Sequence, residues 1–193
     1  MLSLKNSLAV LRKTNALLEG HFILSSGLHS PSYVQCAKLL SNPSKASKIC
    51  LSLSKKIKKK IKKIDLILSP AMGGIIIGYE IGRLLNKETI FSERVDGNLV
   101  LRRGFNLAKG ANVLIVEDVI TTGKSTNECL EKLKLLNINL LGIAEIVDRS
   151  NHKLFKDHDV ISVLKLDIPI YDPNNLPDDL KKIPATKPGS RVI

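Results

Sequence analysis

The fold of this chain is decided by one stretch, Val113-Leu114-Ile115-Val116-Glu117-Asp118-Val119-Ile120-Thr121-Thr122-Gly123-Lys124-Ser125-Thr126. Its first four residues are an apolar, β-branched run typical of a fully buried strand. Two adjacent acids follow where we expect that strand to end, and a hydroxyl-rich turn then leads into a helical pattern. Ligands of open α/β sheets bind outside the carboxyl ends of the strands. The turn at residues 121–125 is therefore the first candidate for a binding site.

Strands and helices alternate along the rest of the chain. We expect helices over residues 3–19, 43–63, 75–85 and 125–136. We expect strands over residues 21–24, 33–36, 65–69, 88–93, 98–102, 113–116, 140–147 and 160–166. This alternation predicts an α/β fold with a mostly parallel central sheet flanked by helices. From Pro169 onward the sequence has five prolines and no periodicity, which predicts an irregular tail packed on the surface.

Length and composition indicate a single globular domain. The chain has 193 residues, 44% of them apolar, and no apolar run approaches the roughly 18 residues of a membrane span. Three widely spaced cysteines, Cys36, Cys50 and Cys129, indicate small buried side chains in a reducing compartment. The first residues lack the pattern of a secretory signal. We therefore expect a cytoplasmic protein with no membrane partner.

The net charge of +12 raises the question of a nucleic-acid partner. Seven lysines lie within residues 55–63, and removing their charges leaves +5. Ile57, Ile61 and Ile64 interrupt this run at helical spacing, so we interpret it as the solvated face of an amphipathic helix. Aromatic residues make up only 4% of the chain, which is few for a surface on which nucleic-acid bases stack. We do not expect a nucleic-acid partner.

The chemistry of the 121–125 turn excludes two nucleotide-binding motifs. A Walker A loop ending at Gly123 needs a glycine five positions earlier, where Asp118 would repel a triphosphate. No dinucleotide fingerprint follows any expected strand either. The turn instead offers hydroxyls, backbone donors and a helix N-terminus to a phosphomonoester. The acidic pair, Glu117 and Asp118, can accept ribose hydroxyls and would favour a cationic ribosyl centre.

Two further segments contain residues that are typical of turns. The glycine segment, Pro70-Ala71-Met72-Gly73-Gly74, joins an expected strand to an expected helix and lets backbone N–H groups approach an anion. By itself this pattern is weak, because Gly-Gly turns are common. Residues 25–31 form a polar turn between two extended pieces. That turn could cover a ligand or serve as an ordinary hairpin connection, and the pattern alone does not choose.

Residues 113–126 closely resemble the signature of the type I phosphoribosyltransferases, which bind 5-phosphoribosyl 1-pyrophosphate with magnesium. Other segments are similar to those of the orotate-using members of that family, namely residues 20–31, 93–95, 101–105, 147–149 and 187–191. The resemblance implies the type I phosphoribosyltransferase fold as a single domain over residues 1–193. It also implies a small hood, formed by about residues 1–40 plus the C-terminal tail, and a flexible basic loop. A homodimer with shared active sites is implied as well.

The resemblance also implies roles for individual residues. The phosphoribosyl donor would be bound by Glu117, Asp118, Val119, Ile120, Thr121, Thr122, Gly123, Lys124 and Ser125, and its pyrophosphate by Ala71, Met72, Gly73 and Gly74. Orotate would be contacted by Thr121 and Arg149. The catalytic residues would be Asp118, Arg94, Arg102 and Arg103. Magnesium is the implied cofactor, held mainly by the substrate, with Asp118 as its one candidate protein contact, through a water.

The implied reaction converts orotate and 5-phosphoribosyl 1-pyrophosphate to orotidine 5′-monophosphate and pyrophosphate. The planar fork of Arg149 suits the carboxylate that distinguishes orotate from uracil. Residues 91–104 contain no histidine, and Gly73 stands where the better-known branch has a lysine, so the identity of the basic catalytic residue stays open. The alternatives are a phosphoribosyltransferase for another base and an RNA-binding regulator with the same fold.

Overall fold

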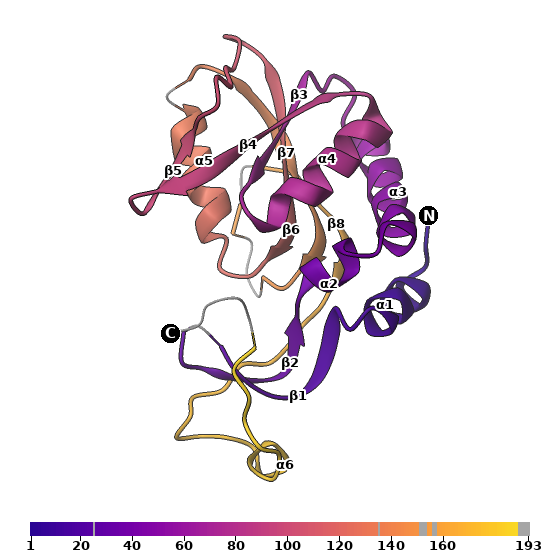
Figure 1. Ribbon diagram of the computed structural model, residues 1–193, viewed down its shortest axis with the longest axis vertical. Coiled ribbons are helices and arrows are strands. Elements are labelled where there is room, and N and C mark those ends of the chain that lie inside the picture. Colours follow the sequence, from indigo (N-terminus) through magenta and orange to yellow (C-terminus); the bar gives the residue numbers. More distant parts are fainter. Residues whose placement is uncertain (25, 135, 151–153, 156–157, 189–193) are drawn as a thin grey trace.

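The computed structural model describes residues 1–24, 26–134, 136–150, 154–155 and 158–188 (Figure 1). Its helices are α1 (Leu4–Lys13), α2 (Cys36–Leu40), α3 (Pro43–Lys60), α4 (Gly73–Leu85), α5 (Lys124–Lys134) and α6 (Asp178–Lys181). Its strands are β1 (Leu17–Ile23), β2 (His29–Val34), β3 (Leu66–Pro70), β4 (Glu88–Val95), β5 (Asn98–Leu101), β6 (Asn112–Ile120), β7 (Asn139–Asp148) and β8 (Val160–Lys165).

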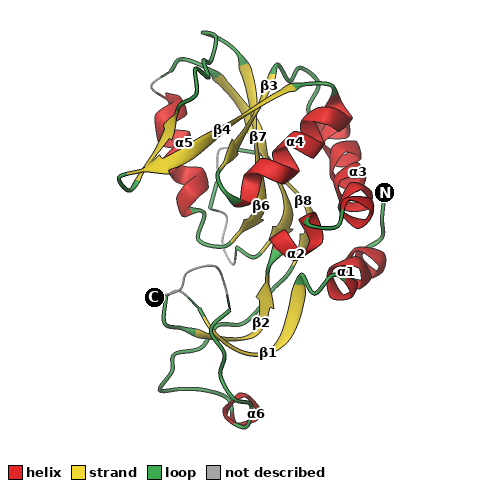
Figure 2. Cartoon of the chain, viewed as in Figure 1, coloured by secondary structure: helices red, strands yellow, loops and turns green. Residues whose placement is uncertain are grey.

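A six-stranded sheet forms the centre of the molecule, in the order β5-β4-β3-β6-β7-β8. All neighbours pair in parallel except β4 and β5. Figure 2 shows α3 and α4 on one side of this sheet and α5 on the other, and a separate apolar core lies on each side. The prediction of an α/β fold with a mostly parallel sheet flanked by helices is confirmed. None of the described helices is long and apolar enough to cross a membrane.

Strand β6 lies in the middle of the sheet and is longer than we expected. Val113 through Val116 are fully buried, as their apolar run predicts. The strand continues to Ile120, because Val119 and Ile120 are β-branched and pair with Val147 and Asp148 of β7. The acidic pair therefore belongs to the strand rather than following it, which corrects the expectation that the strand ends at residue 116.

The helix that we expected over residues 3–19 ends at Lys13. Ser3 is its N-cap, because the hydroxyl of Ser3 accepts a hydrogen bond from the N–H of Asn6 at 3.2 Å. Asn15 then adopts a left-handed conformation with φ of 53°, which ends the helix. The apolar residues that follow enter β1 instead. The helical spacing of the leucines was therefore misleading beyond Lys13.

Strands β1 and β2 form a separate two-stranded antiparallel sheet. They cover residues 17–23 and 29–34, not 21–24 and 33–36 as we expected, and Cys36 begins helix α2. The C-terminal tail runs along this small sheet through bridges from Phe22 to Thr186 and from His29 to Tyr171 (Figure 1). Apart from α6 and these bridges, the described part of the tail is irregular, as predicted.

The lysine-rich helix α3 begins as predicted, with the side chain of Asn42 accepting from the N–H of Lys45 at 3.1 Å. It ends at Lys60 rather than at residue 63, because Ile61 adopts an extended conformation. Within the helix Ile57 is buried and Lys55, Lys58, Lys59 and Lys60 are exposed, which confirms the amphipathic interpretation up to Lys60. Ile61 and Ile64 are also buried, but they lie beyond the helix. The ammonium of Lys56 donates to the backbone carbonyl of Ser162 at 2.8 Å.

The basic segment at residues 91–104 is an antiparallel hairpin of β4 and β5. Its turn is formed by Asp96 and Gly97, with φ of 48° and 81°, as the Asp-Gly sequence predicts for a tight hairpin. The remaining expected helices and strands occur within two residues of their predicted limits, including β3, α4, α5, β7 and β8. The sheet therefore carries the acidic pair and the 121–125 turn on β6 and the hairpin on β4 and β5, with β3 between them.

Candidate active site at the carboxyl ends of the central strands

The glycine segment lies directly against the acidic pair. A Cβ atom added at Gly73 would lie 2.8 Å from both carboxylate oxygens of Asp118. A Cβ atom added at Gly74 would lie 3.3 Å from Oε2 of Glu117 and 3.1 Å from the carbonyl oxygen of Val116. No other residue type could pack at Gly73 without moving Asp118. Two segments that the sequence predicts separately as phosphate-binding and ribose-binding thus meet at the start of α4.

Burial sets the protonation of the acidic pair. Glu117 is 7% exposed, and burial, followed by repulsion from Asp118, raises the pKa of Glu117 to about 8. Burial also raises the pKa of Asp118, although its Oδ1 accepts a hydrogen bond from the N–H of Val119 at 2.8 Å. Two desolvated carboxyls side by side favour hydroxyl donors and positive charge as partners.

The 121–125 turn exposes its polar residues and fixes its backbone through a glycine. Thr121, Thr122 and Lys124 are exposed, while Gly123 is buried. Gly123 has φ of 69° and lies against Phe155, whose ring would be 2.9 Å from an added Cβ atom. Helix α5 starts immediately afterwards at Lys124. The free backbone donors of a helix N-terminus therefore lie next to the acidic pair, where an anion could bind.

Arg149 lies beside the start of this turn. Its backbone N–H donates to the carbonyl oxygen of Ile120 at 2.9 Å, and Ile120 directly precedes Thr121. The Nε atom of Arg149 is buried and has no hydrogen-bond partner among the described residues. Burial lowers the pKa of Arg149, so the guanidinium is short of compensating charge. The structure thus brings Thr121 and Arg149 together, as the two residues expected to contact the same ligand.

Arg149 forms no ion pair with its neighbour Asp148 among the described residues. The carboxylate of Asp148 accepts hydrogen bonds from the N–H and the hydroxyl of Ser150, at 2.8 and 2.6 Å. Lys165 lies 3.8 Å from the same carboxylate. A surface ion pair between neighbours therefore does not explain why an arginine follows Asp148.

The three arginines expected to be catalytic lie on the β4–β5 hairpin and just after it, and each is paired with a glutamate. Arg94 lies 2.6 Å from Glu128 of α5, and Arg102 and Arg103 lie 3.8 and 3.0 Å from Glu93. The described contacts do not join any of them to the acidic pair. These partly exposed ion pairs are weak, so the arginines can exchange partners at little cost. The flexibility of the hairpin stays a prediction.

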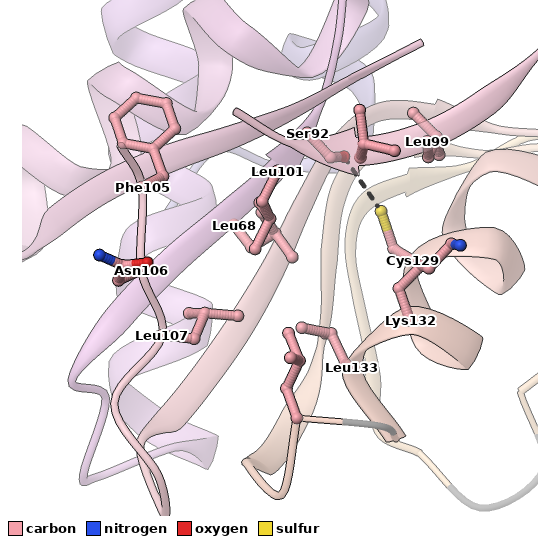
Figure 3. A pocket seen from close by; sticks show the side chains of 12 residues that line it. Leu68, Ser92, Leu99, Leu101, Phe105, Asn106, Leu107, Cys129, Lys132 and Leu133 are labelled. Carbon is pink, nitrogen blue, oxygen red and sulfur yellow. Dashed lines mark hydrogen bonds between the residues drawn. The ribbon is translucent and has the colours of Figure 1, made fainter. Parts of the chain in front are cut away.

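A cavity of about 390 Å³ lies between the hairpin and α5 (Figure 3). Its lining is mostly leucine and phenylalanine side chains, with the hydroxyl of Ser92 and the thiol of Cys129 in contact at 3.3 Å. None of the residues expected to bind substrate lines it. This apolar cavity is therefore distinct from the candidate active site.

Sequence reasoning missed Glu145, which lies opposite Glu117 in the pairing of β6 with β7. Its side chain is fully buried, and its Oε2 accepts a hydrogen bond from the N–H of Ile120 at 3.0 Å. Burial, followed by repulsion from Asp148, raises the pKa of Glu145 to about 9. The signal was present in the sequence as a single acid inside an otherwise apolar strand, Gly-Ile-Ala-Glu-Ile-Val.

Comparison with known proteins assigns the family. The family model of the phosphoribosyl transferase domain matches residues 37–178. The chain is 45% identical over 186 residues to the orotate phosphoribosyltransferase of Erythrobacter litoralis, covering 96% of each protein. It is 46% identical over 182 residues to the enzyme of that name from Parvibaculum lavamentivorans, covering 94% of each. The chain belongs to the orotate phosphoribosyltransferase family.

The orotate phosphoribosyltransferase family also supplies a structural match. The crystal structure of orotate phosphoribosyltransferase from Aeropyrum pernix superimposes with a TM-score of 0.72 at 24% identity, covering 82% of this chain and 92% of that one. This likeness supports the type I phosphoribosyltransferase fold expected from residues 113–126. The family assignment rests on the matches with higher sequence identity.

Members of the phosphoribosyltransferase family generally use magnesium, and the residues of the site fit a weakly held ion. No group of three or more histidine, cysteine, aspartate or glutamate side chains that could hold a metal occurs in the described part of the chain. Asp118 keeps one oxygen outside its hydrogen bond with Val119. These donors suit a hard cation bound mainly by phosphate oxygens, with Asp118 reaching it through water.

The raised pKa of Glu117 predicts a pH-dependent effect of Glu117→Gln on stability. A carboxyl whose pKa rises from 4.5 to about 8 on folding stabilises the protein fully below pH 4.5 and loses that contribution as pH rises through 8. The amide of glutamine stays neutral throughout. We expect the melting temperature of the variant to exceed that of the wild type by roughly 4 °C or more at pH 8, and by far less at pH 5.

Thermal unfolding of both proteins from pH 5 to pH 8.5 measures this difference. Glu88→Gln, at an exposed position on β4, is the control and should show a difference that does not change with pH. An equal difference at pH 5 and pH 8 for Glu117→Gln would show that burial does not perturb this carboxyl.

Proposed function

We propose that this chain transfers the 5-phosphoribosyl group from 5-phosphoribosyl 1-pyrophosphate to orotate, giving orotidine 5′-monophosphate and pyrophosphate. The observation that carries this proposal is the position of Arg149, whose backbone is bonded to Ile120 and whose buried Nε lacks a partner among the described residues. A cationic fork beside a phosphate-binding turn suits an acceptor base that carries a carboxylate. The names of the relatives reported above agree with it.

The 5′-phosphate binds at the 121–125 turn. The attraction of a helix N-terminus for an anion is worth only about 0.3–2 kcal/mol. Hydrogen bonds to a charged group contribute roughly 1.5–3 kcal/mol each, so the backbone donors and the hydroxyls of Thr121, Thr122 and Ser125 supply most of the affinity. The left-handed backbone of Gly123 shapes the turn so that these donors converge.

The ribose lies over the acidic pair. Its hydroxyls donate to Glu117 and Asp118, which satisfies carboxyls that burial otherwise disfavours as anions. When the bond from ribose C1 to pyrophosphate breaks, positive charge develops on the ring. The nearby carboxylates stabilise that charge. The nitrogen of orotate then forms the new bond to C1, and the proton of that nitrogen passes to the departing pyrophosphate. Asp118 is the residue that we expect to matter most, because it touches both the ribose site and Gly73.

The pyrophosphate leaves from the glycine segment. The backbone N–H groups of Met72, Gly73 and Gly74 at the start of α4 hold it next to the acidic pair. Ala71 only shapes this segment, because its N–H already donates to the carbonyl oxygen of Ser92 at 2.7 Å. Mg²⁺, when bound with the donor, would neutralise part of the phosphate charge. Arg94, Arg102 and Arg103 contribute after leaving their glutamate partners. Once held in place against the pyrophosphate, one charge-stabilising donor is worth roughly 10²–10³ in turnover.

The assay for this proposal is the loss of orotate absorbance with 5-phosphoribosyl 1-pyrophosphate, with and without magnesium. We expect magnesium-dependent consumption of orotate and formation of orotidine 5′-monophosphate. Parallel reactions with uracil, adenine and hypoxanthine test the specificity for a carboxylate-bearing base. Folded protein that consumes another base and leaves orotate untouched would overturn the proposal.

Arg149→Ala should separate the two substrates. Removing the fork deprives orotate of a charge-assisted hydrogen bond, so we expect its KM to rise roughly 10-fold to 100-fold. The KM for 5-phosphoribosyl 1-pyrophosphate should change less than about 3-fold. Steady-state kinetics with each substrate varied in turn measures the difference.

Arg83→Ala is the matched control for that variant, because Arg83 is an exposed arginine of α4 that pairs only with Glu80 among the described residues. Both KM values of the control should stay at the wild-type level. Similar increases in the two KM values of Arg149→Ala would remove Arg149 from the orotate site.

We also propose that the protein is a homodimer with shared active sites. Helix α4 and the residue before it expose three apolar side chains, Met72 at 83%, Ile76 at 54% and Tyr79 at 69%. Their spacing of four and three residues puts them on one helix face. A second copy of the chain would cover this face next to the glycine segment. The residues of about 1–40 and the C-terminal tail would form the hood over the site, as their small shared sheet suggests.

The proposed dimer predicts that charges on this face separate the subunits. Ile76→Asp combined with Tyr79→Asp should reduce the mass measured by light scattering from that of two chains to that of one, 21.2 kDa. Leu51→Asp, at a 43% exposed position on α3, is the control and should leave the mass unchanged. A wild-type protein with the mass of one chain would refute the dimer.

We place the enzyme in the cytoplasm. Its three cysteines are free and buried, which suits a reducing compartment. The exposed lysines of residues 55–63 lie at one helix end and the adjoining loop, without aromatic residues among them, so we propose no nucleic-acid partner.

A further inference from the structure

Glu145 is a fully buried acid that makes one hydrogen bond to the backbone of the neighbouring strand. Its Oε2 accepts the N–H of Ile120 at 3.0 Å. Amides in a parallel ladder ordinarily bond to backbone carbonyls of the adjacent strand. Here the N–H of Ile120, the last residue of β6, has a side-chain acceptor in addition to its place in the ladder, where Ile120 pairs with Asp148. The end of this strand therefore has one contact that depends on the identity of residue 145.

Both backbone groups of Ile120 form hydrogen bonds with residues on β7 or directly after it. Its N–H is bonded by Glu145, and its carbonyl oxygen accepts the N–H of Arg149 at 2.9 Å. Thr121, the next residue, begins the 121–125 turn. The position of this turn relative to the sheet is thus set by two hydrogen bonds at one residue.

Packing alone does not explain an acid at this position. The Oε1 atom of Glu145 is buried without a hydrogen-bond partner among the described residues. An unpaired buried polar atom costs about 1–3 kcal/mol, which an apolar side chain of similar volume would avoid. Burial also raises the pKa of Glu145 to about 9, so the side chain is neutral near pH 7 and acts there as a hydrogen-bonding group rather than as a charge.

We propose that Glu145 is a positioning residue for the phosphoribosyl donor: by holding the N–H of Ile120, it fixes the strand end from which the 121–125 turn receives the 5′-phosphate. The role rests on the proposed function only in taking a ribose phosphate as the ligand. It does not depend on which base accepts the phosphoribosyl group. Glu145 itself touches no substrate and acts through Ile120.

Calorimetry with ribose 5-phosphate tests this role through two variants. Glu145→Gln keeps an acceptor for the N–H of Ile120 and should bind ribose 5-phosphate within about 2-fold of the wild type. Glu145→Met has a similar length and no comparable acceptor, so its Kd should rise roughly 10-fold, equivalent to about 1.4 kcal/mol. Inorganic pyrophosphate, whose proposed site is the glycine segment, should bind both variants as it binds the wild type.

A merely structural role would give a different pattern. Lower thermal stability of Glu145→Met with unchanged affinity for ribose 5-phosphate would overturn the proposal, and so would a loss of affinity in Glu145→Gln equal to that in Glu145→Met. If Glu145→Met does not fold, Glu145→Ala removes the same acceptor without adding bulk, and the same comparison with Glu145→Gln applies.

Two further measurements separate the role of Glu145 from a loss of stability and from the proposed function. Ile143→Val, a fully buried change on the same strand, is the control and should lower stability without altering the Kd. Normal binding of ribose 5-phosphate by a wild-type protein that leaves orotate unchanged would refute the proposed function and leave the role of Glu145 standing.

Discussion

The contact between the carboxylate of Asp118 and the bare Cα of Gly73 is the constraint on which the site depends. It brings the start of α4 onto the end of β6, so that the helix N-terminus and the acidic pair share one small volume. The same helix lies close to the sheet further along, where a Cβ atom at Gly78 would fall 2.0 Å from the hydroxyl oxygen of Ser69. A chain without these glycines would hold the helix further out and separate the two halves of the site.

This arrangement places poorly solvated ionisable side chains at one site, where the polar groups of a bound ligand would stabilise them. Glu117, Asp118 and Glu145 are all acids whose pKa is raised by burial, while burial lowers the pKa of Arg149 on the same edge of the sheet. None of these groups is well solvated, and Arg149 keeps an unpaired donor among the described residues. A sugar phosphate with a carboxylate-bearing base would supply hydroxyl donors to Glu117 and Asp118 and an acceptor to Arg149.

The sequence predicts the central architecture because its signals there are local. The buried run at residues 113–116 is confirmed, and the Asp96-Gly97 turn and the Asn42 cap likewise depend only on neighbouring residues. The contact of Gly73 with Asp118 and the support of Ile120 by Glu145 join residues far apart in the chain, so periodicity could not reveal them. The leucines after Lys13 show the converse, because their spacing continues the helical pattern although Leu17 and Leu18 belong to the strand that follows Asn15.

The lysine-rich helix has a consequence for how the molecule behaves in a crowded solution. Strand β8 is an edge of the central sheet, and an edge offers its backbone groups to any extended chain nearby. The ammonium of Lys56 occupies two carbonyls of that strand, those of Ser162 and Val163, at 2.8 and 3.2 Å. An incoming strand would have to displace this half-buried ammonium group from them. Lys56 thus hinders intermolecular β-pairing at the edge formed by β8. The exposed lysines of residues 55–63 add electrostatic repulsion between copies of the protein.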